Sequence, residues 1–69
     1  MTPKLDLHGI RHRDVQIVVE NFLFTHEMPA RIIAGNSAKM KQLVMEVLSK
    51  HGYAHMILSN NLGQIVVLK

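Results

Sequence analysis

The sequence contains no cysteine, so neither a disulfide bond nor a thiolate zinc site can hold the chain together. Aromatic residues are also scarce, since Phe22, Phe24 and Tyr53 are the only ones. The core is therefore expected to be aliphatic, and a platform on which splayed bases could stack is poorly provided for. The lack of cysteine fits a reducing compartment, and we expect a cytoplasmic protein.

The sequence also lacks a secretory signal, and no apolar run approaches the roughly 20 residues that a bilayer requires. We therefore expect no membrane partner. The 69 residues predict a single domain, residues 1–69, and an initial methionine with a final strand favours a complete chain. Eight Lys and Arg against five Asp and Glu give a net charge of +3, which leans mildly towards a polyanionic partner.

Hydrophobic spacing predicts six elements in the order β-α-β-α-β-β. Alternation at residues 5–8 and apolar runs at 31–34, 53–58 and 64–68 are typical of strands, the last two joined by a turn at 59–63. Stripes with helical spacing predict one helix at about 12–27 and another between Ser37 and Gly52. Parallel pairing with right-handed crossovers gives an α/β (α+β) two-layer sandwich. Its four-stranded mixed sheet carries two helices on one face and leaves the other face open.

The stretch Leu5-Asp6-Leu7-His8-Gly9 is the first candidate site. Asp6 and His8 lie on one face of a strand and Gly9 permits a tight turn after them. The pair could share a proton, bind a divalent cation or orient a water molecule near a phosphate. The alternative is structural: His8 caps the turn and Asp6 forms an ion pair with Lys or Arg on a neighbouring strand.

Gly35-Asn36-Ser37 is the second candidate site, because it follows a strand and opens a helix. Backbone N–H groups and the positive end of the helix dipole favour a phosphate there. Lys39 and Lys41 lie in the first turn of the same helix, where a cation opposes the dipole. The alternative is an ordinary turn in which Asn36 or Ser37 caps the helix.

Arg11, His12 and Arg13 place positive charge at the start of the first helix as well. Two basic helix starts at the carboxyl edge of a partly parallel sheet suit a protein that binds a phosphate backbone. A chain selected only for stability would place acids at those positions.

Three segments together resemble the Smr (small MutS-related) domain family over the whole length of the chain. They are Leu5-Asp6-Leu7-His8-Gly9, Ile32-Ile33-Ala34-Gly35 and the closing residues 63–69, Gly-Gln-Ile-Val-Val-Leu-Lys. The leading LDLHG is the most specific of them. The resemblance implies a β-α-β-α-β-β sandwich similar to the C-terminal domain of a translation initiation factor, in agreement with the order above.

The resemblance also implies nucleic-acid binding, and in several family members DNA nicking or RNA cleavage. Asp6 and His8 match the Asp and His implicated in activity, and Asp14 keeps an acid near the start of the first helix. The family's second motif is a Gly-x-Gly loop, whose first glycine corresponds to Gly35. Here Ala34 stands in place of the usual His or Thr, Ser37 replaces the second glycine, and the loop is several residues shorter. These departures count against cleavage more than against binding.

Three interpretations stay open from the sequence. The first is a nucleic-acid-binding Smr-like module, with RNA favoured over DNA. The second is an endonuclease that uses Asp6 and His8, with no cofactor certain and a divalent metal, Mg or Mn, as the candidate. The third is a protein-interaction module without catalysis, whose open sheet face carries Ile33, Ile57 and Ile65 and pairs with a second copy or another protein.

Overall fold

The computed structural model describes residues 2–58 and 63–69, which fold in the expected order. The elements are β1 (Lys4–Asp6), α1 (His12–Thr25), β2 (Ala30–Ile33), α2 (Ala38–Lys50), β3 (His55–Ile57) and β4 (Gln64–Val67). Helix α1 ends two residues earlier than the pattern predicts. Strands β1, β3 and β4 are shorter than the runs that predicted them, whereas β2 has the predicted length and begins one residue earlier. The turn expected at 59–63 lies outside the described residues except for Gly63.

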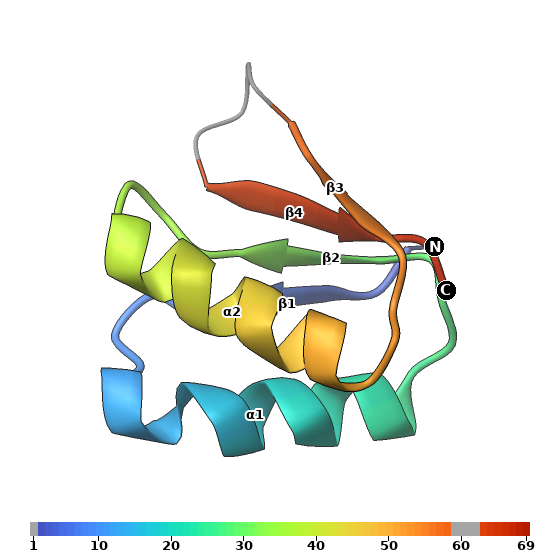
Figure 1. Cartoon of the computed structure of the whole chain (residues 1–69), viewed down its shortest axis with the longest axis horizontal. Coiled ribbons are helices and arrows are strands. Elements are labelled where there is room, and N and C mark those ends of the chain that lie inside the picture. The colour runs from blue at the N-terminus through green and yellow to red at the C-terminus, as the bar shows by residue number, and fades with distance from the viewer. Residues whose placement is uncertain (1, 59–62) are drawn as a thin grey trace.

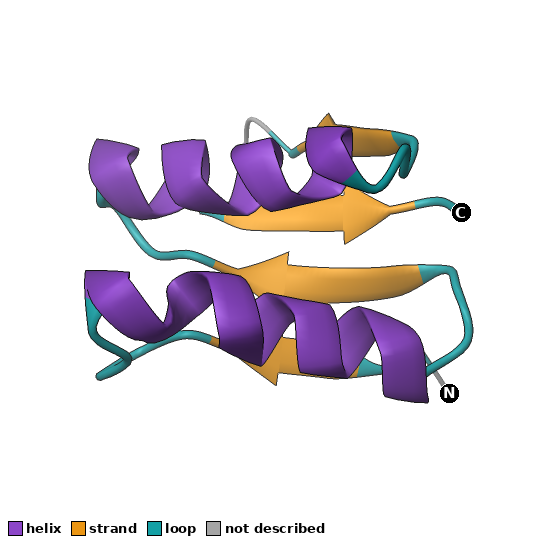
Figure 2. Ribbon diagram, turned by 60° about the horizontal axis from the view of Figure 1, so that its bottom comes forward, coloured by secondary structure: helices purple, strands orange, loops and turns teal. Residues whose placement is uncertain are grey.

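The four strands form one mixed sheet in the order β1-β2-β4-β3. Strands β1 and β2 pair in parallel, whereas β4 is antiparallel to both of its neighbours, β2 and β3. The interior position predicted for β2 is therefore confirmed, as is the β3–β4 hairpin. Both helices cover the same face of the sheet and leave the other face uncovered (Figures 1 and 2). The predicted two-layer sandwich is thus present.

The core lies between the sheet and the helices and is aliphatic, as the scarcity of aromatic residues suggested. Its fully buried large side chains are Leu7, Ile32, Ile65 and Val67 from the sheet side and Val15, Val19, Val44 and Leu48 from the helices. Of the two phenylalanines in α1, Phe22 is buried whereas Phe24 is 63% exposed. The helical stripes identified in the sequence are therefore the surfaces that pack on the sheet.

The open sheet face differs from the expectation at Ile65. Cross-strand partners share a face, and Ile65 pairs with Ile32, which faces the helices; both are completely buried. Ile57 pairs with Ile65 and so belongs to the helix-covered side, although its place at the edge leaves it 46% exposed. The prediction that Ile33, Ile57 and Ile65 share the open face was wrong for Ile57 and Ile65. The residues that do lie on it include Lys4, Arg31, Ile33, Val66 and Met56.

Candidate nucleic-acid interface

The two candidate turns lie side by side at one end of the sheet. Because β1 and β2 run in parallel with Asp6 opposite Ile33, the segments that follow them leave the sheet at the same edge. Together they line a groove of about 400 Å³. The groove is lined by Asp6, Leu7, His8 and Gly9 from the first turn and by Ile33, Ala34, Gly35, Asn36, Ser37 and Met40 from the second. We call it the turn groove.

The first turn is held by Asp6 itself. The backbone N–H of His8 donates to Asp6 Oδ1 at 2.9 Å, and the N–H of Ile10 donates to the carbonyl of Leu7 at 3.0 Å. Gly9 has a φ of +82°, a conformation that favours glycine. The structural alternative had assigned the cap of this turn to His8. In the structure Asp6 caps the turn, by accepting the main-chain N–H of His8. Among residues 2–58 and 63–69, Asp6 forms no ion pair with Lys or Arg.

The second turn begins with Gly35 at a φ of +73° and ends in a helix cap. Ser37, rather than Asn36, is the capping residue, since its Oγ accepts the N–H of Met40 at 3.1 Å. The carbonyl of Ser37 accepts the N–H of Lys41 at 3.1 Å. In the described part of the chain, the first helical N–H groups, those of Ala38 and Lys39, have no acceptor. They leave the start of α2 available to an anion.

Gly63 supports the second turn from behind, a role that sequence reasoning missed. Its carbonyl accepts the N–H of Ala34 at 2.6 Å, and a Cβ added to it would overlap the backbone of Gly35. This close approach requires a glycine at position 63, whereas Gly35 is favoured by its positive φ and has open space where a Cβ would lie. The only sequence signal was the glycine that opens the closing motif, and its packing partner lies 28 positions away in the chain (63 against 35).

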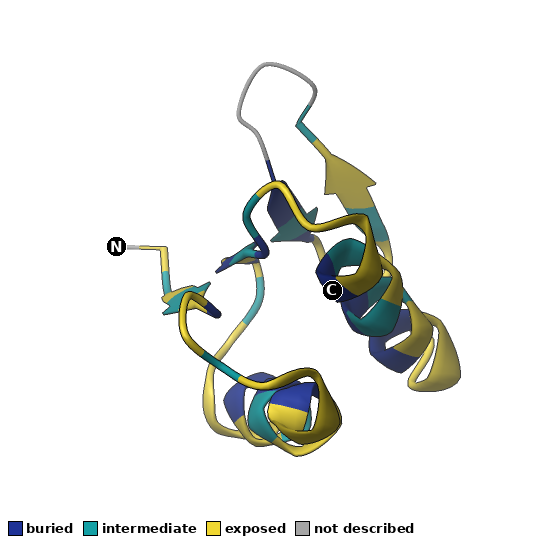
Figure 3. Cartoon of the chain, turned by 90° about the vertical axis from the view of Figure 1, so that its left-hand side faces the viewer, coloured by how far each residue is buried: buried dark blue, intermediate teal, exposed yellow. Residues whose placement is uncertain are grey.

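Both helices begin at the same end of the molecule as the turn groove (Figure 1). Seen from that end, the two turns and the helix starts are largely exposed (Figure 3). The basic residues there are Arg11, His12, Arg13 and Lys39, which are exposed, and Lys41, which is half-buried. Asp14 is the acid in the first turn of α1, and the first turn of α2 contains none. This end therefore carries much of the positive charge of the chain.

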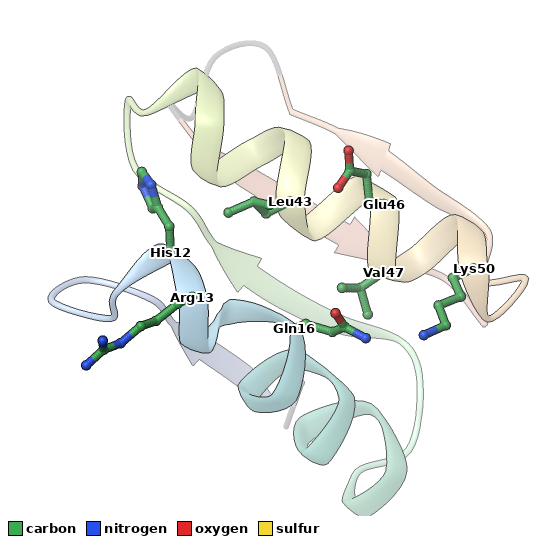
Figure 4. A pocket seen from close by; sticks show the side chains of 7 residues that line it. All are labelled: His12, Arg13, Gln16, Leu43, Glu46, Val47 and Lys50. Carbon is green, nitrogen blue, oxygen red and sulfur yellow. The ribbon is translucent and has the colours of Figure 1, made fainter.

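Two of the predicted site residues, His12 and Arg13, line a second groove rather than the turn groove. It measures about 390 Å³, lies between the two helices and is lined by His12, Arg13, Gln16, Leu43, Glu46, Val47 and Lys50 (Figure 4). His12 and Arg13 lie at one end of this helix groove and Lys50 at the other (Figure 4). Gly9, Gly35, Asn36 and Ser37 thus join Asp6 and His8 in the turn groove, whereas His12 and Arg13 line the helix groove. Arg11, Lys39 and Lys41 line neither and flank the helix starts.

An ion-pair cluster joins the two helices on their outer side. His51 Nε2 lies 2.8 Å from Glu20 Oε2, and Lys50 Nζ lies 3.9 Å from the same oxygen. The hydrogen bond with His51 lowers the pKa of the Glu20 carboxyl from its ordinary value, against an opposing effect of partial burial. The Phe24 ring meets the imidazole of His51 edge-on at 5.3 Å between centroids. The sequence pattern around Glu20 and His51 did not predict this contact.

Asp6 and His8 are the two metal-ligand types in the turn groove. Within residues 2–58 and 63–69, no three His, Asp or Glu side chains gather closely enough to form a metal site of their own. A Mg²⁺-type ion needs fewer protein ligands, because one or two carboxylates suffice when phosphate oxygens and water complete its shell. The second oxygen of Asp6 fits that use, since no described residue occupies it.

Neither helix is long and apolar enough to span a bilayer, as judged on the residues that the structure describes. Comparison of the chain with models of protein families, with curated proteins and with solved structures returns no match. Similarity to the Smr family therefore rests on the residues quoted above and stays a prediction.

Proposed function

We propose that this chain binds nucleic acid as an Smr-like module, with the phosphate backbone at the turn groove and RNA favoured over DNA. The observation that carries the proposal is that the LDLHG turn and the Gly35–Ser37 turn line one groove at the basic end of the molecule. The two turns are 26 positions apart at their glycines (35 against 9), so the fold alone brings them together.

The start of α2 offers the donors for a phosphate. The N–H groups of Ala38 and Lys39 have no acceptor among the described residues, and the helix dipole adds a partial positive charge there. Lys39 supplies a full charge beside them, and no acid in the first turn of α2 offsets it. A backbone phosphate in this position would also lie within the field of Arg11 and Arg13 from the neighbouring helix start.

The carboxylate of Asp6 restricts which groups can lie beside a phosphate in the turn groove. A carboxylate repels a phosphate unless a cation or a hydrogen-bond donor lies between them. A ribose 2′-hydroxyl can supply that donor and a deoxyribose cannot, which supports RNA as the preferred ligand.

Binding and its salt dependence test the proposal most directly. We expect the affinity for a labelled RNA to fall steeply with salt, because each neutralised phosphate releases counterions. The double variant Arg13→Ala/Lys39→Ala should reduce the slope of log K against log salt by about 1.4, or about 0.7 per lost contact with a single strand. The matched control is Lys4→Ala/Lys69→Ala, which removes the same two charges from a net charge of +3 but leaves the helix starts intact. Equal losses in both variants, or no binding at low salt, would overturn the proposal.

Cleavage is the second candidate function, favoured because Asp6 and His8 both line the turn groove. Structured RNA and supercoiled plasmid, each with and without Mg²⁺ or Mn²⁺, provide the substrates. If the chain is an endonuclease, Asp6→Asn/His8→Ala should abolish nicking and only weaken binding. Unchanged cleavage by that variant would identify a contaminating nuclease.

A further inference from the structure

The two edges of the sheet are protected very differently. On the β1 edge, Pro3 precedes the strand and Lys4 and Asp6 place charges along it. Such residues are the usual means by which proteins prevent edge strands from pairing with other chains. The β3 edge has neither, because residues 51–68 contain no Asp, Glu, Lys, Arg or Pro.

The main chain of β3 has groups that point away from the sheet and find no partner among residues 2–58 and 63–69. Two residues beside β3 bond to β4 or to the residues that follow it. The N–H of Leu58 donates to the carbonyl of Gln64, the N–H of Ala54 donates to that of Lys69, and the N–H of Leu68 donates to the carbonyl of Ala54. Antiparallel strands alternate between residues that bond to a neighbour and residues that do not, so Met56 also bonds to β4. The N–H and C=O groups of His55 and Ile57 consequently face outwards from the edge.

Two of the three side chains of β3, Met56 and Ile57, are apolar and exposed at the same place. Met56 is 50% exposed and Ile57 is 46% exposed. Met56 pairs with Val66 on the open face, and Leu68 lies on the same face and is 45% exposed. Unpaired main-chain groups and exposed apolar side chains thus coincide on one strand.

We infer that β3 is a self-association edge, on which a second copy of this chain adds its own β3 in antiparallel orientation about a two-fold axis at Met56. In that register, His55 of one copy lies opposite Ile57 of the other, and these are the residues whose main-chain groups point outwards. Each copy therefore supplies the donors and acceptors that the other lacks. The two four-stranded sheets become one continuous sheet, with the two Met56 side chains adjacent on the open face.

The charge distribution favours a second copy over a charged partner. The edge carries no formal charge to attract a charged strand, while its apolar side chains complement themselves across the two-fold axis. The turn groove, with the basic helix starts beside it, belongs to the end of the sheet formed by β1 and β2, and β4 separates these strands from the β3 edge. Because β3 is only three residues long, the interface is small and the dimer should form reversibly with concentration.

Sedimentation of the full chain tests the association. We expect the mean mass to rise from that of the 7.8 kDa protomer towards twice that value as the concentration approaches about 1 mM, the range of weak complexes. Ile57→Lys should keep the chain monomeric over the same range, with its helical circular dichroism unchanged. A constant protomer mass in the unmodified chain would overturn the inference, including the case in which the edge accepts a strand from a different protein.

The absence of cysteine makes the register testable as well. Met56→Cys introduces the sole thiol, and residues directly opposite in a non-bonded antiparallel pair lie close enough for a disulfide. We expect mild oxidation to yield a covalent dimer much faster than it does for Ile17→Cys, a site on α1 that is 59% exposed and thus somewhat more accessible than Met56 at 50%. Equal rates for the two variants would overturn the register at Met56. Because neither variant touches the turn groove, these outcomes are independent of nucleic-acid binding.

Discussion

The turn groove depends on glycines for two different physical reasons. Gly9 and Gly35 permit a backbone with positive φ, and each has open space where a side chain would be. Gly63 has a positive φ too, but its backbone lies directly against that of Gly35. A side chain at position 63 would therefore displace the turn that we assign to phosphate binding.

Gly63→Ala tests this contact against a matched control at Gly52. Both glycines have a φ of +76°, but no atom of the described residues lies within 4 Å of the Cβ position of Gly52. Gly52→Ala should thus cost only backbone strain, about 1 kcal/mol of the free energy of unfolding. Gly63→Ala adds an overlap with backbone and should cost about 2–4 kcal/mol, measured by urea denaturation. Similar costs for the two variants would show that the approach of Gly63 to Gly35 is unimportant.

At the scale of the elements, a polar contact joins the two helices in addition to the packing of their apolar stripes. Glu20 of α1 meets His51 directly after α2, with Lys50 beside them. The pKa of Glu20 is lower in the folded chain than its ordinary value of 4.5. The ionised carboxylate therefore stabilises the folded state at pH values above 4.5, and this stabilisation is lost as the pH falls through the lowered pKa.

Glu20→Gln should consequently reduce the Tm by a small amount at pH 6 and by less at pH 3, where a larger fraction of the unmodified carboxyl is protonated. Thermal unfolding followed by circular dichroism measures the difference. On a His51→Gln background, the effect of Glu20→Gln at pH 6 should shrink, because the main partner of the carboxylate is already absent. A Tm difference that does not change with pH would contradict the role assigned to the pair.

The elements show what local pattern can and cannot predict. The order of the elements, a cap at Asn36 or Ser37 and the end of the second helix before Gly52 follow from spacing and from residue chemistry within a few positions. The structure decides the cap in favour of Ser37. The face on which Ile65 lies does not follow, since Ile65-Val66-Val67-Leu68 is apolar throughout and has no alternation to fix its orientation. The Glu20–His51 and Gly35–Gly63 contacts could not be predicted from the sequence either, because each joins segments that only the folded chain brings together.

For the molecule as a whole, the face that β4 turns towards the helices decides which of its side chains belong to the core. A domain of this size has a free energy of unfolding of only about 3–10 kcal/mol. Ile65 lies completely buried between sheet and helices, whereas its neighbour Val66 is half-buried on the open face.

Ile65→Ala should therefore cost about 2–5 kcal/mol, enough to unfold a substantial part of the population. Val66→Ala removes less buried surface and should cost about 1 kcal/mol. Urea denaturation of the two variants measures the contrast. A larger loss for Val66→Ala would mean that β4 presents its opposite face to the helices.

The position of β4 between β2 and β3 also has a consequence for the order of folding. In the part of the chain that the structure describes, strand β3 pairs with β4 alone, and β4 follows it in the chain. Residues 4–58 can therefore form the β1–α1–β2 unit by themselves, whereas β3 can join the sheet only after β4 is in place. Assembly then requires β4 to enter between two strands that precede it, a non-local step that slows folding. During synthesis, the supporting contact of Gly63 behind Gly35 cannot form until β4 has left the ribosome, so the turn groove is incomplete while only residues 4–58 have emerged.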